Sequence, residues 1–137
     1  MSDEHPARAA ALRSMDAVHA NDKQAWVDNF ADDAIVEDPI GPSPLDPEGK
    51  GHRGKQAIAA FWDQQIAPNR VMFNIKHSYA AGSEVANVGT ITIVMPNGAV
   101  MLVNGVFTYK VDDLGKVLSL RAYWEFGGLK AFPPREA

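Results

Sequence analysis

The chain has 137 residues, of which 46% are hydrophobic and 22% charged, as expected for one soluble globular domain with its own core. Its net charge of −4 and its scattered basic residues exclude the phosphate-binding surface of a nucleic-acid-binding protein. The absence of cysteine excludes disulfides and thiolate catalysis. No apolar run approaches the roughly 20 residues of a membrane span, and residues 1–8 lack the apolar core of a signal peptide. We therefore expect a single cytoplasmic domain over residues 1–137 that binds neither nucleic acid nor membranes.

Two helices are predicted at the start of the chain. Apolar residues at helical spacing indicate an amphipathic helix over about residues 6–19. Asn21, followed three residues later by Gln24, resembles a capping box. A second helix is therefore expected to begin at this point and to end near residues 31–33.

A short strand, a long loop and a third helix complete the first half. Residues 34–38 alternate between two faces and predict a strand that Pro39 ends. Residues 41–54 contain four glycines and three prolines, a composition that predicts a surface loop. Residues 55–66 carry apolar side chains at helical spacing and predict the third helix.

In the second half the apolar residues alternate with a period of two, which predicts strands. The expected strands cover about residues 71–79, 85–95, 99–111 and 116–126. Asn97-Gly98 predicts a type I′ hairpin turn, because both central positions of that turn need positive φ. The tail after Gly128 carries two adjacent prolines and is expected to be loose.

Three helices followed by an antiparallel meander predict an α+β fold in which the sheet curls around a helix. Strands such as residues 85–95 are apolar on both faces. One face can pack on the helices, and the other is then left as an exposed patch. This pattern predicts a homodimer formed through the outer face of the sheet.

Asp38 is the candidate catalytic carboxylate. By alternation it shares the apolar face of its strand with Ala34 and Val36, next to Pro39. Partial desolvation at such a position raises the pKa of a carboxyl group and makes it a better general base. From spacing alone, the residue is also consistent with a loop aspartate that caps a turn, so both interpretations stay open.

Three segments resemble the Δ5-3-ketosteroid isomerase branch of the NTF2-like (SnoaL-like) superfamily. They are residues 30–41 (FADDAIVEDPIG), 56–62 (QAIAAFW) and 121–124 (RAYW). The resemblance covers most of the chain in the same order, and the Glu-Asp-Pro-x-Gly stretch is what indicates this branch. It implies a cone with three N-terminal helices packed on a strongly curved, mainly antiparallel sheet, and no cofactor. It also implies that Asp38 moves a proton between two carbons of a steroid's A and B rings.

The family pairs its aspartate base with an oxyanion hole made of a tyrosine and a protonated aspartate. The resemblance puts Ser14 and Phe107 at those two positions, so this chain lacks both strong donors. The loss of one such donor typically lowers the rate on the order of 10²–10³. Tyr109 lies two residues beyond Phe107 on the same strand face and is the candidate replacement. Trp62 and Ser14 are further candidates, and all three are also consistent with a core role.

An apolar substrate cavity is expected from strand alternation and from the resemblance. Its predicted wall, of which each member is also consistent with a plain core role, comprises Ser14, Phe30, Trp62, Val88, Phe107, Leu120, Ala122 and Trp124, with Thr90 and Thr92 on the strand of Val88.

The histidines do not form a predicted metal site. His77 lies on the apolar face of its strand and is interpreted as a hydrogen-bonded core histidine or as a second base. His19, His52 and His77 fall on different elements without the spacing of metal ligands. We therefore expect no bound metal.

Three functions are consistent with these residues. The first is a cofactor-independent isomerase of a 3-oxo-Δ5-steroid or a similar flat apolar ketone, with Asp38 as its base. The second is a protein that binds steroids or other apolar small molecules with little or no turnover. The third is epoxide hydrolysis, dehydration or polyketide cyclisation in the same fold, although Arg121 alternates away from Trp124 and so disfavours an inward Asp-Arg-Asp set. Analogy of fold does not choose among these chemistries.

Overall fold

Three helices precede the main strands in the computed structural model of the chain, which describes residues 4–134. The helices are α1 (Pro6–His19), α2 (Lys23–Asp28) and α3 (Lys55–Phe61), and a π-helical turn, Trp62–Ile66, prolongs α3. The strands are β1 (Phe30–Glu37), β2 (His52–Arg53), β3 (Arg70–Ala81), β4 (Glu84–Val94), β5 (Val100–Val111), β6 (Val117–Tyr123) and β7 (Lys130–Phe132). The arrangement has the expected α+β class.

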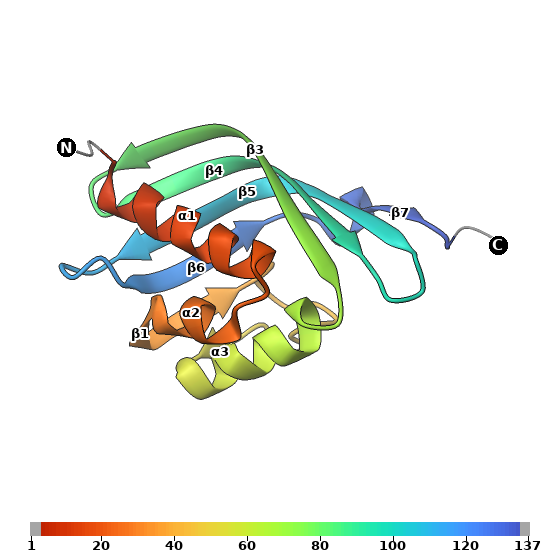
Figure 1. Cartoon of the computed structure of the whole chain (residues 1–137), viewed down its shortest axis with the longest axis horizontal. Helices are drawn as coiled ribbons and strands as arrows, with labels where there is room; N and C mark the ends of the chain where they lie inside the picture. Colours follow the sequence, from red (N-terminus) through yellow and green to blue (C-terminus); the bar gives the residue numbers. More distant parts are fainter. Residues whose placement is uncertain (1–3, 135–137) are drawn as a thin grey trace.

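Helix α1 lies across one face of β3, β4 and β5 (Figure 1). Pro6 occupies its first turn, where the missing N–H costs no hydrogen bond. The side chain of His5 caps this end by accepting a hydrogen bond from Ala7 N at 3.1 Å. Small residues make up most of the buried face of the helix, namely Ala7, Ala10, Ala11, Ser14 and Ala17. Because these side chains are short, the helix can lie close to the strands.

The second helix and the first strand begin at other residues than predicted. Asp22, and not Asn21, is the N-cap of α2, and its carboxylate accepts a hydrogen bond from Ala25 N at 3.0 Å. Asn21 instead has a φ of 54°, a conformation that asparagine tolerates better than most residues. Strand β1 starts already at Phe30, because this residue pairs with Val117 of β6. Pairing between distant segments leaves no trace in local periodicity.

The strands form one mixed, mostly antiparallel sheet with the order β2-β1-β6-β5-β4-β3. The meander from β3 to β6 is antiparallel, as predicted. β1 runs parallel to β6, with Val36 opposite Leu120 and Glu37 opposite Arg121. This pairing brings the end of β1 beside the end of β6. The predicted loop over residues 41–54 contains β2, which pairs with β1.

Two local predictions about turns and ends are wrong. Of Asn97 and Gly98, only the glycine has a positive φ, of 88°, whereas a type I′ turn needs both. The hairpin closes through a hydrogen bond from Gly98 N to Met95 O at 2.9 Å. The tail that was expected to be loose contains β7, in which Phe132 pairs with Val100 of β5. It is held because β5 extends beyond the end of β6 and offers free backbone groups there.

A β-bulge between Ile75 and His77 reverses the faces of β3. Before the bulge, Val71, Phe73 and Ile75 pack against the core. After it, His77 is exposed. The interpretation of His77 as a core histidine is therefore wrong, because the inserted residue shifts the alternation by one position.

Trp26 lies at the centre of the aromatic core and is 2% exposed. Its ring lies 4.8 Å from that of Phe30 in an edge-on contact and 5.4 Å from that of Trp62, measured between centroids. The ring of Phe61 stacks on it at 6.3 Å. These contacts bury large aromatic surfaces and join α2 to β1 and to α3.

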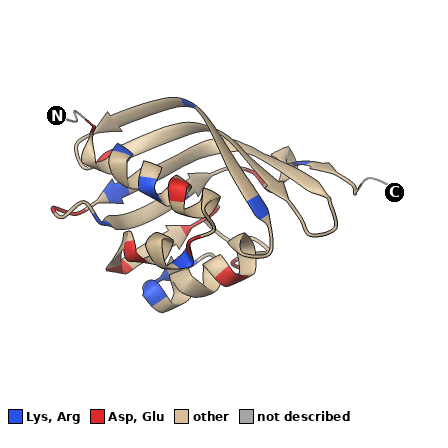
Figure 2. Ribbon diagram, in the orientation of Figure 1, with Lys and Arg blue, Asp and Glu red and all other residues tan. Residues whose placement is uncertain are grey.

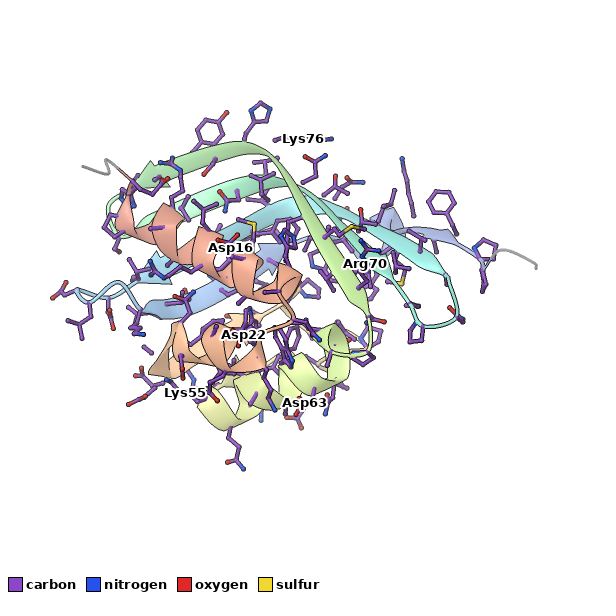
Figure 3. All side chains as sticks on the ribbon, in the orientation of Figure 1. Asp16, Asp22, Lys55, Asp63, Arg70 and Lys76 are labelled. Atoms are coloured by element: carbon purple, nitrogen blue, oxygen red, sulfur yellow. The ribbon has the colours of Figure 1, made fainter. Side chains whose placement is uncertain are left out.

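Charged side chains lie at the outside of the molecule. Figure 2 shows acidic and basic residues interspersed over the helices and strands rather than gathered in one patch. Side chains labelled in Figure 3, such as Lys76 on β3 and Asp63 after α3, are exposed. Within residues 4–134, no helix combines the length and the apolar character that crossing a membrane requires.

We expect Gly89, the glycine of β4, to tolerate replacement poorly. A Cβ atom there would clash with Asn74 O and lie 2.9 Å from Ile75 Cα, because the β3 backbone approaches closely next to the bulge. Gly89→Ala should lower the free energy of unfolding by about 1–3 kcal/mol, measured by urea denaturation. Gly127→Ala is the control, since a Cβ there meets nothing within 4 Å. Equal and small effects of both substitutions would contradict the close approach.

Candidate functional site

A cavity of about 220 Å³ lies between α1, the end of α3 and the inner face of the sheet. Its wall is mostly apolar and includes Phe73 of β3, Val103 of β5 and Leu45 from the loop after β1. The described residues that add a polar side chain other than tryptophan are Ser14, Asp38, Gln65, Asn69, Asn87 and Tyr109. An apolar cavity with few polar groups is typical of a small-molecule site.

Asp38 directly follows β1 and lines this cavity. The backbone on both sides is held in place, because Val36 is fully buried and Ile40 N donates a hydrogen bond to Ala122 O at 3.1 Å. The indole Nε1 of Trp124 donates a hydrogen bond to Asp38 Oδ1 at 2.6 Å. The parallel pairing of β1 with β6 thus brings a carboxylate and an N–H donor together at one edge of the cavity.

Opposing effects act on the pKa of Asp38. Burial raises the pKa of this carboxyl above its usual range, because desolvation disfavours the charged form. The hydrogen bond from Trp124 and the charge of His52 act in the opposite direction, since both favour the carboxylate. Asp38 is half-buried and faces the cavity. A carboxylate of raised basicity that a ligand can reach is suited to taking a proton from carbon.

Three buried side chains form a hydrogen-bonded chain beside the cavity. Trp26 Nε1 donates to Ser14 Oγ at 3.1 Å, and Tyr109 Oη donates to the same oxygen at 3.4 Å. An indole N–H can only donate, so Ser14 must accept from Trp26, and its own proton remains available. The distance of 3.4 Å is long for two hydroxyl groups. The Tyr109 hydroxyl is therefore held only weakly and can turn toward a ligand.

Tyr109 remains protonated over the physiological pH range. Burial raises the pKa of Tyr109 to about 12, an effect that the hydrogen bond to Ser14 opposes and the charge of Asp38 reinforces. The side chain is 4% exposed and lines the cavity. It is consequently a neutral hydrogen-bond donor within an apolar site that also contains a carboxylate.

Six of the residues predicted from the sequence meet at this cavity. They are Ser14, Asp38, Phe107, Tyr109, Leu120 and Trp124. They come from α1, the end of β1, β5 and the end of β6, so only the folded sheet brings them together.

The other predicted wall residues lie elsewhere. Phe30 and Trp62 are buried against Trp26, behind the cavity lining. Ala122 is buried but packs in the core instead. Val88 is half-buried and alternates with the inward residues of its strand, and its neighbours Thr90 and Thr92 share its face. The prediction that Val88, Thr90 and Thr92 line the cavity is wrong. Both faces of β4 carry apolar residues, and the opposite face of the strand points inward.

Several lining residues were missed by sequence reasoning. Asn87, Ile91 and Ile93 form the inward face of β4. A strand with apolar residues on both sides gave no signal for this choice, although an asparagine in such a run is unusual. Gln65 and Asn69 line the cavity from the end of α3 and the turn after it. Glutamine and asparagine side chains are mostly exposed in proteins, so these residue types offered no reason to place them in the cavity.

The described residues offer no group of three or more His, Cys, Asp or Glu side chains arranged to hold a metal ion. His52 lies 5.0 Å from Phe61, ring to ring, and is half-buried. His77 stacks on exposed Tyr79 at 6.3 Å on the far side of the sheet from the core. The candidate reactive groups at the cavity are Asp38 and Tyr109.

Known proteins resemble this chain over nearly its whole length. A family described as the SnoaL-like domain matches residues 11–120. The crystal structure of a Δ5-3-ketosteroid isomerase from Mycobacterium sp. is 39% identical, with a TM-score of 0.91, over 94% of this chain and 100% of that chain. The fold is accordingly NTF2-like.

Two further structures are also similar. Rv0760c from Mycobacterium tuberculosis, in complex with estradiol-17beta-hemisuccinate, is 34% identical, with a TM-score of 0.89, over 93% of this chain and 99% of that chain. A computationally designed 17-OHP binder is 31% identical, with a TM-score of 0.91, over 94% of this chain and 100% of that chain. Both of these similar proteins are thus described with a bound or intended ligand, estradiol-17beta-hemisuccinate and 17-OHP respectively.

Asp38→Asn should change the pH dependence of stability. A group whose pKa is raised by folding contributes stability below its unfolded pKa and loses that contribution as pH rises through the folded pKa. Asparagine cannot ionise, and its amide oxygen can still accept the hydrogen bond from Trp124. The Tm of the variant minus that of the wild type should therefore increase between about pH 3 and about pH 8, measured by circular dichroism.

The control is Asp113→Asn, which changes an exposed carboxylate in the turn between β5 and β6. It should show no such increase. A constant Tm difference for Asp38→Asn across the whole range would mean that the burial of the carboxylate has no energetic consequence.

Proposed function

This chain belongs to the SnoaL-like domain family, and we propose that it is a ketosteroid-isomerase-like enzyme that moves a C=C bond of a 3-oxo-Δ5-steroid or a similar flat apolar ketone. The observation that carries the proposal is the Asp38 carboxylate, which lines an apolar cavity and accepts a single short hydrogen bond from Trp124. The 39% identity to a Δ5-3-ketosteroid isomerase supports it.

In the proposed reaction, Asp38 acts twice. Its carboxylate takes the proton from the carbon between the carbonyl and the C=C bond, and the electron pair moves into a conjugated dienolate. The carboxylic acid then returns the same proton to the far end of the former double bond. The product is the conjugated enone, and the carboxylate is regenerated without a cofactor. A base of raised pKa favours the first step.

The negative charge of the dienolate oxygen needs a donor. Tyr109 is the candidate, because its hydroxyl lines the cavity and is held only at 3.4 Å by Ser14. If the tyrosine turns to the ligand, Ser14 can donate its own proton to Tyr109 Oη while accepting from Trp26. Hydrogen bonds linked in this way strengthen one another. Trp62 is no longer a candidate, since it lies outside the cavity lining.

A second candidate function is the binding of steroids with little turnover. The observation that favours it is Phe107, which lines the cavity where the related isomerases place a second strong donor. Loss of such a donor lowers the rate on the order of 10²–10³, but it leaves the apolar wall intact. The similar complex with estradiol-17beta-hemisuccinate and the designed 17-OHP binder are consistent with a binding protein.

Two structural expectations belong to this proposal. A strongly curved sheet would enclose the ligand, and the bulge in β3 at His77 supports such a bend. A homodimer through the outer face would cover half-buried Val88 and exposed Met72. Analytical ultracentrifugation of the protein tests the dimer.

Incubation with androst-5-ene-3,17-dione tests the isomerase directly, because the conjugated enone absorbs in the ultraviolet. Asp38→Asn should lower kcat by about 10²- to 10⁴-fold, the usual effect of losing a general base, without losing the ligand-induced quenching of tryptophan fluorescence. Equal rates of wild type and variant would remove Asp38 from the mechanism. Tight quenching with no turnover by the wild type would establish the binding function instead.

Trp124→Phe should move the acid limb of the pH profile of kcat/KM to higher pH. The indole N–H lowers the pKa of Asp38, so its removal leaves burial less opposed and the pKa rises further. The base is active only when ionised, and activity is therefore lost at a higher pH in the variant. Trp62→Phe is the matched control outside the lining and should leave the limb in place. A profile unchanged by Trp124→Phe would argue against Asp38 as the titrating base.

A further inference from the structure

Asn87 carries a buried amide oxygen with no hydrogen-bond partner among the described residues. It is 3% exposed, it lines the cavity, and its Oδ1 accepts no hydrogen bond from any described residue. Its neighbours on the inward face of β4 are Val85 and Gly89, with Ile91 beyond the glycine, and none of them has a polar side chain. An unpaired amide in such surroundings is unfavourable unless another molecule satisfies it. The amide oxygen can only accept, so the group of this side chain that can donate a hydrogen bond to a molecule in the cavity is Nδ2.

The position of Asn87 in the sheet connects it to Tyr109. Asn87 is paired directly with Phe107 across the β4–β5 ladder, and Tyr109 is paired with Val85. Asn87 and Tyr109 are thus diagonal neighbours, about 7–8 Å apart, and both face the cavity. An oxygen atom between them could accept one hydrogen bond from each side chain. The amide N–H and the hydroxyl would then approach the same ligand atom.

We propose that Asn87 Nδ2 donates a hydrogen bond to the carbonyl oxygen of the ligand and, together with Tyr109, forms the oxyanion hole. This inference rests on the proposed isomerase and names the ligand class that fits it, a flat ketone or enone with its oxygen turned toward β4 and β5. Asn87, on the strand next to Phe107, supplies the hydrogen bond that the apolar side chain of Phe107 cannot donate. The amide is neutral at every pH, and it donates most strongly when the oxygen carries the charge of the dienolate.

The test compares Asn87→Leu with Asn74→Leu. The substitution is the same, on adjacent strands, but Asn74 is exposed on β3 between residues that face inward. Leucine has the same branching and the same number of side-chain heavy atoms as asparagine, but no polar atom. Asn87→Val is made in parallel, so that a misfit of the leucine side chain does not decide the result. The Tm of the Asn87 variants should equal or exceed that of the wild type, because an unpaired buried amide has been removed.

Binding is measured by tryptophan quenching with androst-4-ene-3,17-dione and with its 3-deoxy analogue, androst-4-en-17-one. Asn87→Leu should weaken binding of the 3-ketone by about 3- to 10-fold, as for the loss of one neutral hydrogen bond, and leave the 3-deoxy compound unchanged. The turnover of androst-5-ene-3,17-dione should fall on the order of 100-fold. Asn74→Leu should change neither quantity.

The carbonyl itself supplies a second readout. Each hydrogen bond lowers the stretching frequency of a C=O group, and a ¹³C label at C3 makes that band identifiable by infrared difference spectroscopy. The bound ketone should show a lowered frequency in the wild type. In Asn87→Leu the band should shift back toward its position in an apolar solvent, and in Asn74→Leu it should not move.

The outcomes separate this inference from the proposed function. If the wild type binds the ketone without turning it over and the Asn87 variants lose the frequency shift, the donor is established and the isomerase is not. If the wild type isomerises the substrate and the Asn87 variants match it in rate and frequency, the isomerase stands and the donor is overturned. Equal weakening of the ketone and its 3-deoxy analogue, or a large loss of Tm in both Asn87 variants, would also overturn it. A wild type that binds neither steroid would overturn both.

Discussion

The hydroxyl oxygen of Ser14 accepts a hydrogen bond from Trp26 and another, longer one from Tyr109. These residues come from α1, α2 and β5, so the helices and the sheet meet at one atom. All three side chains are almost completely buried, and all three line the cavity. The ring of Trp26 also packs edge-on against Phe30 in the aromatic core. Ser14 therefore lies between this aromatic core and the polar groups of the cavity.

A second constraint comes from the parallel pairing of β1 with β6. It places Asp38 beside Trp124, and the 2.6 Å hydrogen bond between them orients the carboxylate. The salt bridge between Glu37 and Arg121, at 3.1 Å, joins the same two strands. Glu37, the last residue of β1, and Asp38, which follows it, thus point in opposite directions: Glu37 pairs with Arg121, and Asp38 faces the cavity.

The cavity combines a carboxylate of raised pKa with few hydrogen-bond donors. Asp38 is made more basic by burial, while Tyr109 is kept neutral by the same apolar surroundings. Phe107 offers the cavity no hydrogen-bond donor. Asn87, whose amide oxygen has no partner among the described residues, lies directly opposite Phe107 on the adjacent strand. A cavity of this composition favours apolar ligands, since each extra polar group would find few partners.

Local sequence patterns were enough to predict the α+β class, the three helices and the main strands in their order, and they named Asp38 as the candidate carboxylate. Helical and strand periodicity are local properties, and the segment around Asp38 is itself a recognisable motif. The tertiary structure alone decided that Asn87 and not Val88 lines the cavity, since β4 is apolar on both faces and only the position of α1 distinguishes them. It also decided that His77 is exposed, because one inserted residue in β3 reverses the alternation, and that Ser14, Trp26 and Tyr109 meet. Contacts between residues far apart in the chain depend on strand register and helix packing, which a local pattern does not contain.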